Sequence, residues 1–332
     1  MACITWLVGW AAAISPAAAG AAVALATALP PAPVPAAPPP TATVAVLVDE
    51  FGDDILPEKK AMYDAIINGI ERGCDARVEV LSFDRKRENI TPRLTEAKNL
   101  NPDAVVALGS NALKIVLKAR TTFSCPITFS GVLHPEVYVR EYADVCGVSL
   151  NVDARHQLEV LRQNIEGISR VGIVYASGSS DAQVELARST AKRQGIEVVA
   201  EGVRGLDEAL KAVDRLEDAD VDVFLLLPDA LISQDAVFHR MRQASVRHDI
   251  PIISPSAAHL RDDAILSFEV DYERCGLDTA ALLNRLFGGE KPQEVGIVHQ
   301  RDPIMGLNSK IARAMRITIP PRLRKLADHE IR

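Results

Sequence analysis

The chain has 332 residues, of which 48% are hydrophobic and 5% aromatic, which is enough for two α/β domains with separate cores. Its formal net charge is −7, and no extended Lys/Arg-rich run occurs. The composition therefore argues against nucleic-acid binding, because phosphate recognition requires a basic surface.

Residues 1–43 differ in composition from the rest of the chain. They contain no charged residue, and the first charged residue of the sequence is Asp49. Residues 1–29 are apolar and Ala-rich, with A-x-A motifs at 24–26 and 26–28, and they predict a cleaved export signal. An uncleaved membrane anchor is the alternative. Residues 30–43 form a Pro/Ala tract that predicts an extended linker. We therefore expect a periplasmic or otherwise extracytoplasmic protein that contacts the membrane only if the anchor is kept.

Short apolar runs alternate with helical patterns along the whole body of the chain. In the first half, strands are expected at 44–48, 78–81, 105–108, 126–129 and 147–149. In the second half they are expected at 171–175, 196–199, 223–227, 251–253, 264–268 and 295–298. Helices are expected between them, including one that begins at Pro57 and one at 272–287. This alternation predicts right-handed βαβ units and parallel sheets.

The pattern of the first half repeats in the second, so we expect two doubly wound, Rossmann-like lobes of flavodoxin type. The expected N-terminal lobe is 44–150 with 255–294, and the expected C-terminal lobe is 151–254 with 295–332. In open parallel sheets, ligands bind beyond the carboxyl ends of the strands, so candidate residues are sought there.

Four candidates follow strands of the first half. Ser110 and Asn111 begin a helix directly after a buried strand, where free backbone N–H groups favour a carboxylate or phosphate; simple helix capping is the alternative. Glu50 and Phe51 follow the first strand and could meet an amine and stack on a ligand, or form a solvated loop.

The remaining candidates are His134 in the first half and four residues in the second. His134 could be a hydrogen-bond partner or pH sensor, or could face solvent in a turn. Tyr175 and Ser177 begin the first loop of the second half. Asp229 ends a Leu-rich strand and could bind an ammonium group or stabilise a helix N-terminus. Ser254 lies at an expected crossing between the lobes, as a hinge or contact residue or neither.

Motifs for catalysis and metal binding are missing from the sequence. There is no G-x-S-x-G, Walker loop, H-E-x-x-H or C-x-x-C, and the seven histidines lack metal-ligand spacing. Among the five cysteines, Cys125 and Cys146 either form a disulfide or remain buried thiols. We therefore expect no enzyme activity, no cofactor and no metal.

Several stretches resemble the ABC-transporter substrate-binding family. They include LGSNA (108–112), CPITFSGV (125–132), CGVSLNVD (146–153), VGIVYASGSSD (171–181), DVFLLLPDA (222–230), VDYERCGLDTA (270–280) and the final GLNSKIARAMRITIPPRLRKLAD (306–328). This resemblance implies the type I periplasmic binding protein fold, in which two lobes close on a small molecule and present it to a membrane permease. Some members of the family bind amino acids, including aromatic ones.

The sequence departs from the family pattern at two expected cleft positions. His134-Pro135 stands where the family usually has Asp-Pro, and Ala176-Ser177 where it usually has Asn-Pro. The family's ligand is therefore not carried over. We expect the periplasmic substrate-binding component of an ABC importer, for an amino acid or related small carboxylate. The alternative is an extracytoplasmic sensing module that signals to a membrane kinase or cyclase.

Overall fold

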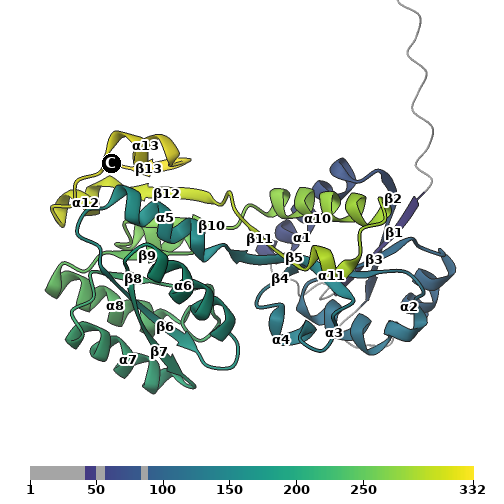
Figure 1. Ribbon diagram of the computed structural model, residues 1–332, viewed down its shortest axis with the longest axis horizontal. Coiled ribbons are helices and arrows are strands. Elements are labelled where there is room, and N and C mark those ends of the chain that lie inside the picture. The colour runs from purple at the N-terminus through teal and green to yellow at the C-terminus, as the bar shows by residue number, and fades with distance from the viewer. Residues whose placement is uncertain (1–41, 50–56, 84–88) are drawn as a thin grey trace, which may run out of the picture. The chain divides into compact units, whose positions relative to one another are not determined.

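The computed structural model describes residues 42–49, 57–83 and 89–332 (Figure 1). The expected signal and most of the expected linker therefore lie outside the described residues, as do Glu50 and Phe51. None of the described helices is long and apolar enough to cross a membrane.

The first sheet contains six parallel strands in the order β11-β5-β4-β3-β1-β2. Their bounds are β1 Ala42–Asp49, β2 Ala76–Phe83, β3 Ala104–Leu108, β4 Ile127–Val132, β5 Val145–Val152 and β11 Ile297–Gln300. One face packs on α1 (Pro57–Gly73) and α10 (Tyr272–Phe287), and the other on α2 (Ile90–Asn99) and α3 (Ser110–Lys118). The short helices α4 (Glu136–Val139) and α11 (Pro292–Val295) complete this lobe.

The position of strand β1 between two layers of helices explains why its sequence is an unbroken apolar run. Val44 and Val46 pack in the core that contains α1 and α10, whereas Ala45 and Leu47 pack in the core under α3. A parallel strand covered by helices on both faces has no polar side, so it reads as an unbroken hydrophobic run.

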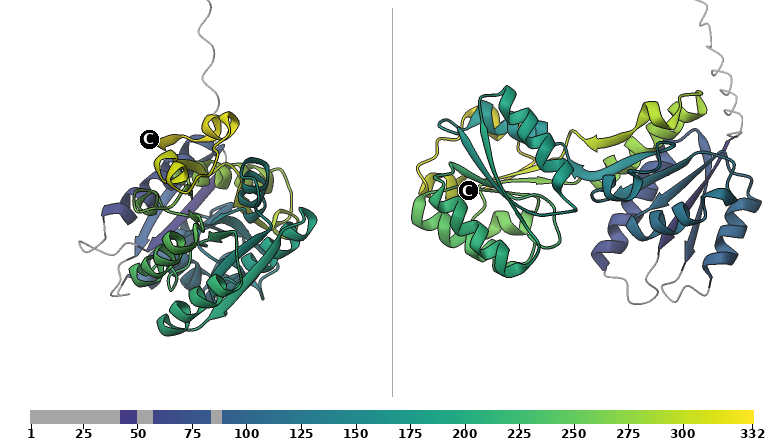
Figure 2. Two further views of the ribbon diagram at one scale, coloured as in Figure 1. Left: turned by 90° about the vertical axis from the view of Figure 1, so that its left-hand side faces the viewer. Right: turned by 60° about the horizontal axis from the view of Figure 1, so that its bottom comes forward.

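The second sheet contains seven strands in the order β13-β12-β10-β9-β8-β6-β7. Their bounds are β6 Arg170–Ala176, β7 Glu197–Val203, β8 Val223–Leu225, β9 Ile252–Ser254, β10 Leu266–Glu269, β12 Ile304–Asn308 and β13 His329–Ile331. The helices are α5 Ala154–Asn164, α6 Asp181–Arg193, α7 Leu206–Asp218, α8 Asp235–His248, α9 Ala257–Arg261, α12 Ser309–Ala314 and α13 Pro321–Leu326. All pairings are parallel except that of β10 with β12. Helices cover both faces of this sheet too (Figure 2).

The chain crosses between the sheets after β5, between β10 and α10, and between β11 and β12 (Figure 1). The lobe boundaries expected from the sequence predict the second crossing after residue 254 and the third after residue 294. Instead β10 pairs with β9 and stays in the second sheet, and β11 pairs with β5 in the first. Buried strands of either sheet have the same apolar signature, so the sequence pattern does not show which sheet a strand joins.

Helices α1 and α10 approach each other through two glycines, Gly69 and Gly276. A Cβ at Gly276 would lie 2.1 Å from the carbonyl oxygen of Ile66, and one at Gly69 would lie 2.3 Å from that of Glu273. Only glycine allows this backbone approach.

The four described cysteines are free, so Cys125 and Cys146 form no disulfide. Cys146 is fully buried, and burial raises the pKa of its thiol to about 12. It therefore behaves as a small apolar residue, as the second of the two alternatives has it.

Candidate functional site

The carboxyl edge of the first sheet brings together Asp49, Asn111 and Tyr63. Asp49 is the last residue of β1 and is 6% exposed, and its Oδ2 accepts a hydrogen bond from Nδ2 of Asn111 at 2.8 Å. Burial, with a smaller effect from the charge of Asp49, raises the pKa of Tyr63 to about 12. The phenol therefore stays protonated, and part of the Asn111 amide is engaged by the protein itself.

Helix α3 begins at Ser110 without a capping side chain. Its N-cap is Gly109, whose φ is +87°, and a Cβ there would lie 2.4 Å from the Tyr63 hydroxyl oxygen. The alternative in which Ser110 or Asn111 caps this helix is therefore wrong. The Ser110 hydroxyl forms no hydrogen bond with the described residues, so it and the first-turn N–H groups can meet a ligand.

Asp229 holds two loops of the second sheet together. It is 3% exposed, and its Oδ2 accepts hydrogen bonds from the backbone N–H of Ala176 at 2.9 Å and from the Ser180 hydroxyl. Its Oδ1 accepts from the N–H groups of Leu231 and Ile232 at 2.9 and 3.4 Å. Since the carboxylate is satisfied by protein donors, its role here is to shape the β6–α6 and β8–α8 loops.

Ser254 is engaged inside the second lobe and does not lie at a crossing. Its hydroxyl is 2.7 Å from Nδ1 of His259 and accepts the N–H of Ser256 at 3.1 Å. The His259 ring stacks on Phe238 with centroids 3.9 Å apart, and burial lowers the pKa of His259. Either the Ser254 hydroxyl or Nδ1 of His259 donates in this hydrogen bond, because the neutral imidazole has two tautomers.

Tyr175 and Ser177 lie over the edge strand of the second sheet. A Cβ on Gly202 of β7 would lie 2.6 Å from Oγ of Ser177 and 2.9 Å from the Tyr175 hydroxyl oxygen. Strand β7 is the outermost strand on the side opposite β10. Both side chains therefore cover a different part of the carboxyl edge from the loops after β8 and β9.

His134 forms a hydrogen bond between the lobes. Its Nε2 lies 2.9 Å from the carbonyl oxygen of Pro228, in the loop after β8. Because a carbonyl only accepts, Nε2 carries the hydrogen, and Nδ1 is buried with no partner among the described residues. The backbone of His134 has φ +48°, a conformation unusual for a non-glycine residue. Its partner in this structure is thus protein rather than solvent.

A cavity of about 510 Å³ lies beside this hydrogen bond, with walls from both lobes. Leu133 and Leu150 come from the first lobe, whereas Gln157 and Phe268 come from the second. The full lining is Leu133, Leu150, Val152, Gln157, Pro228, Asp229, Ala230, Ser233, Pro255, Ser256, Ala257, Ala258, Phe268, Glu269, Val270 and Tyr272. A pocket of this size with apolar walls and a few polar groups is typical of small-molecule sites.

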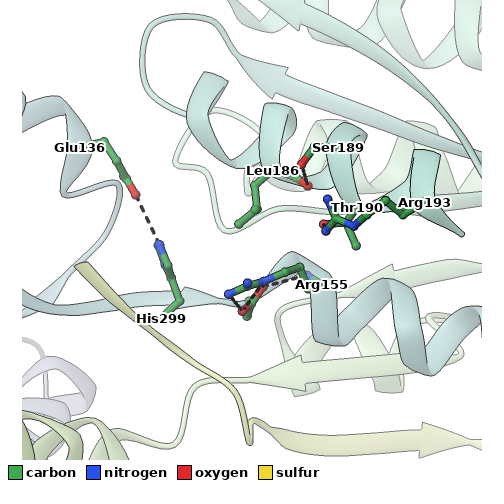
Figure 3. A network of polar contacts seen from close by, with 8 residues as sticks. Glu136, Arg155, Leu186, Ser189, Thr190, Arg193 and His299 are labelled. Carbon is green, nitrogen blue, oxygen red and sulfur yellow. Dashed lines mark hydrogen bonds and ion pairs between the residues drawn. The ribbon is translucent and has the colours of Figure 1, made fainter. Parts of the chain in front are cut away.

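A polar network surrounds the crossing segments (Figure 3). Nε2 of His299 lies 3.6 Å from the carboxylate of Glu136, and burial lowers the pKa of His299. Arg155 donates to both carboxylate oxygens of Asp153 at 2.6–3.0 Å. Burial opposes the charged form of Asp153, but the Arg155 hydrogen bonds outweigh it and hold the Asp153 pKa below its usual value.

The sequence profile of the ABC transporter substrate binding protein family matches residues 44–331. The chain belongs to this family. Proteins of the family bind small molecules, work with ABC permeases and are not enzymes. No curated protein sequence matches the chain.

Several solved structures share this fold at low sequence identity. An L-Trp complex from Streptococcus pneumoniae is 21% identical with TM-score 0.56, and covers 87% of this chain and 99% of its own. The ligand-free, open protein CD0873 from Clostridium difficile is 16% identical with TM-score 0.63, and covers 88% and 100%. A conserved domain protein from Vibrio cholerae is 20% identical with TM-score 0.57, and covers 87% and 99%. The two lobes thus form the type I periplasmic binding protein fold.

The structure of this substrate-binding protein separates the predicted site residues into groups. Ser110 and Asn111 lie at the first sheet and Tyr175 and Ser177 near β7, and Asp229 is the only predicted site residue within the described part of the chain that lines the cavity. Sequence reasoning missed the lining residues Gln157, Phe268, Glu269 and Tyr272, and also Asp49 and Tyr63. Gln157 had a usable signal, because it interrupts the apolar face of α5 formed by buried positions 154, 158 and 161.

Proposed function

We propose that this protein is the periplasmic substrate-binding component of an ABC importer, and that a small ligand such as an amino acid or a related small carboxylate binds between its lobes. The observation that carries the proposal is the cavity of about 510 Å³ whose walls come from both lobes. A ligand in such a position stabilises the arrangement in which both walls contact it, since only differential affinity shifts a conformational equilibrium.

The hydrogen bond from His134 to Pro228 supports the same proposal. It joins the loop after β4 to the loop after β8 at 2.9 Å, next to the lining residues Leu133 and Asp229. For a carboxylate end, the first turn of α3 and the Ser110 hydroxyl, which has no partner among the described residues, provide donors at the first sheet.

The test is native mass spectrometry of gently purified protein, followed by a thermal-shift panel of amino acids and small anions. A co-purified small molecule, or stabilisation by one compound with ligand-dependent compaction in X-ray scattering, supports the proposal. Ligand at about 100 times its dissociation constant adds roughly 2.7 kcal/mol of stability. A protein that stays empty, unshifted and unchanged in scattering contradicts it.

The alternative, a sensing module for a membrane kinase or cyclase, depends on the apolar residues 1–29. Retention of this segment as an anchor favours sensing, and its removal favours transport. Sequencing the N-terminus of the mature protein distinguishes the two.

A further inference from the structure

The charged side chains that line the cavity between the lobes, among the described residues, are all acidic. Its lining contains the carboxylates of Asp229 and Glu269, and no Lys, Arg or His occurs among the described residues that line it. Much of the remaining wall is apolar, and includes Leu133, Leu150 and Phe268. A wall without a cation offers no charged partner to an anionic group, whereas it suits a neutral or cationic one.

Gln157 is a largely buried residue whose side-chain amide has no hydrogen-bond partner among the described residues. The residue is 2% exposed and lines the cavity, yet its side chain forms no hydrogen bond with any described residue. The Gln157 amide atoms are not among the fully enclosed, unpartnered polar atoms of the described residues, so they are accessible from the cavity. The Gln157 carbonyl and amino groups are therefore available to a bound molecule.

Glu269 supplies the second polar group of the cavity. One of its oxygens accepts a hydrogen bond from the Ser267 hydroxyl at 2.9 Å and lies 3.5 Å from Nε2 of His329. A carboxylate has about four acceptor sites, so Glu269 retains capacity for a ligand donor. Its side chain is 24% exposed, which lets it reach the cavity without being fully desolvated.

We propose that this cavity is a subsite for an organic ammonium group carried on an apolar body, with the carboxylate of Glu269 and the side-chain oxygen of Gln157 as its acceptors. Charge-assisted hydrogen bonds to the ammonium group supply the orientation, and the Leu and Phe walls bind the apolar body. This inference rests on the proposed function, because it defines the chemistry of the same ligand site.

The experiment uses three probes with one apolar body: phenethylamine, phenethyl alcohol and hydrocinnamate. Their binding to the full chain is measured by ligand-observed NMR and thermal shift. Phenethylamine should bind about tenfold tighter than hydrocinnamate, with the alcohol between them, as expected for about one charge-assisted hydrogen bond. Equal or tighter binding of hydrocinnamate, or no binding by any probe, overturns the proposal.

Two variants identify the acceptors. Glu269→Gln should remove the preference for the amine over the alcohol, whereas Gln157→Leu should weaken both by about fivefold. Gln157→Leu should not lower the melting temperature of the empty protein, since no protein hydrogen bond is lost. Unchanged phenethylamine affinity in both variants, or a lower melting temperature for Gln157→Leu, contradicts the assignment.

Gln183→Leu is the matched control. Gln183 of α6 is 6% exposed with an unpartnered Oε1 among the described residues, but it does not line the cavity. This variant should leave the affinity of all probes unchanged. If hydrocinnamate binds more tightly and still compacts the protein, only the ammonium assignment is overturned. The proposed function itself is rejected only if the search for a natural ligand and the scattering experiment also fail.

Discussion

The side chain of Gln300 pairs with the backbone of Asp271 in both directions. Its Oε1 accepts the Asp271 N–H at 2.9 Å, and its Nε2 donates to the Asp271 carbonyl at 2.7 Å. The backbone carbonyl of Gln300 also accepts the N–H of Asp153 at 3.0 Å. Since Asp153, Asp271 and Gln300 lie at the three crossings, one residue links all the segments that join the lobes.

Gln300→Leu should destabilise the protein by about 2–4 kcal/mol, because two backbone groups of Asp271 lose their partners. Urea unfolding measures the change. Gln293→Leu, at an exposed position of α11, is the control and should change stability by less than about 0.5 kcal/mol. Equal effects of both substitutions would show that the Gln300 pair is not stabilising.

His134→Asn should weaken the contact between the lobes while tolerating the positive φ of this position. Asn is too short to replace the Nε2 hydrogen bond to Pro228, which is worth about 1 kcal/mol. We expect weaker ligand-dependent compaction, measured by X-ray scattering, with each lobe still folded by circular dichroism. His239→Asn, an exposed substitution on α8, should compact like the unmodified protein.

Gly276→Ala should cost about 1–3 kcal/mol, because the new methyl group meets the backbone of α1. Thermal unfolding measures this loss. Gly205→Ala is the control, since a Cβ there meets nothing within 4 Å. A Gly276 variant as stable as the Gly205 variant would mean that α1 and α10 can separate at little cost.

The folded protein should lose stability as the pH falls below about 6.5, in part through His259. Burial lowers the pKa of His259 from its ordinary value of 6.5, so the unfolded chain binds a proton before the folded one. The contribution is absent above pH 6.5 and grows as the pH falls toward the folded-state pKa. His259→Gln should flatten the dependence of unfolding free energy on pH between about 7 and 5, compared with the exposed His239→Gln. Identical slopes would exclude this role.

Much of the fold could be predicted from the sequence, because it depends on local patterns of apolar and helix-capping residues. The run at 44–48 is buried on both faces, and α10 begins at Tyr272 because Asp271 caps it by accepting the N–H of Arg274. The strands β12 and β13 were not predicted. Residues 304–308 include Gly306 and Asn308, which disfavour strands, and β13 has only three residues.

The candidate site was less predictable, because tertiary partners decide what each polar side chain does. Asp229 looks like a free carboxylate after a strand, yet four hydrogen bonds from two loops occupy it. His134 finds its partner in Pro228, 94 residues away along the chain. Such long-range pairings cannot be predicted from the spacing of residues along the sequence.

The sheet order also determines when each lobe can be completed during synthesis. The first sheet needs β11 at Ile297–Gln300, and the second needs β12 at Ile304–Asn308, whose pairing covers the edge of β10 beside the ligand cavity. Neither lobe can therefore finish folding while the polypeptide is still being made up to residue 296. In most multidomain chains the N-terminal domain folds completely before the next domain has been made, and this strand order prevents that sequence of events. The first sheet is completed by β11 at Ile297–Gln300, whereas the second sheet receives β12 at Ile304–Asn308 and its last strand, β13, only at His329–Ile331.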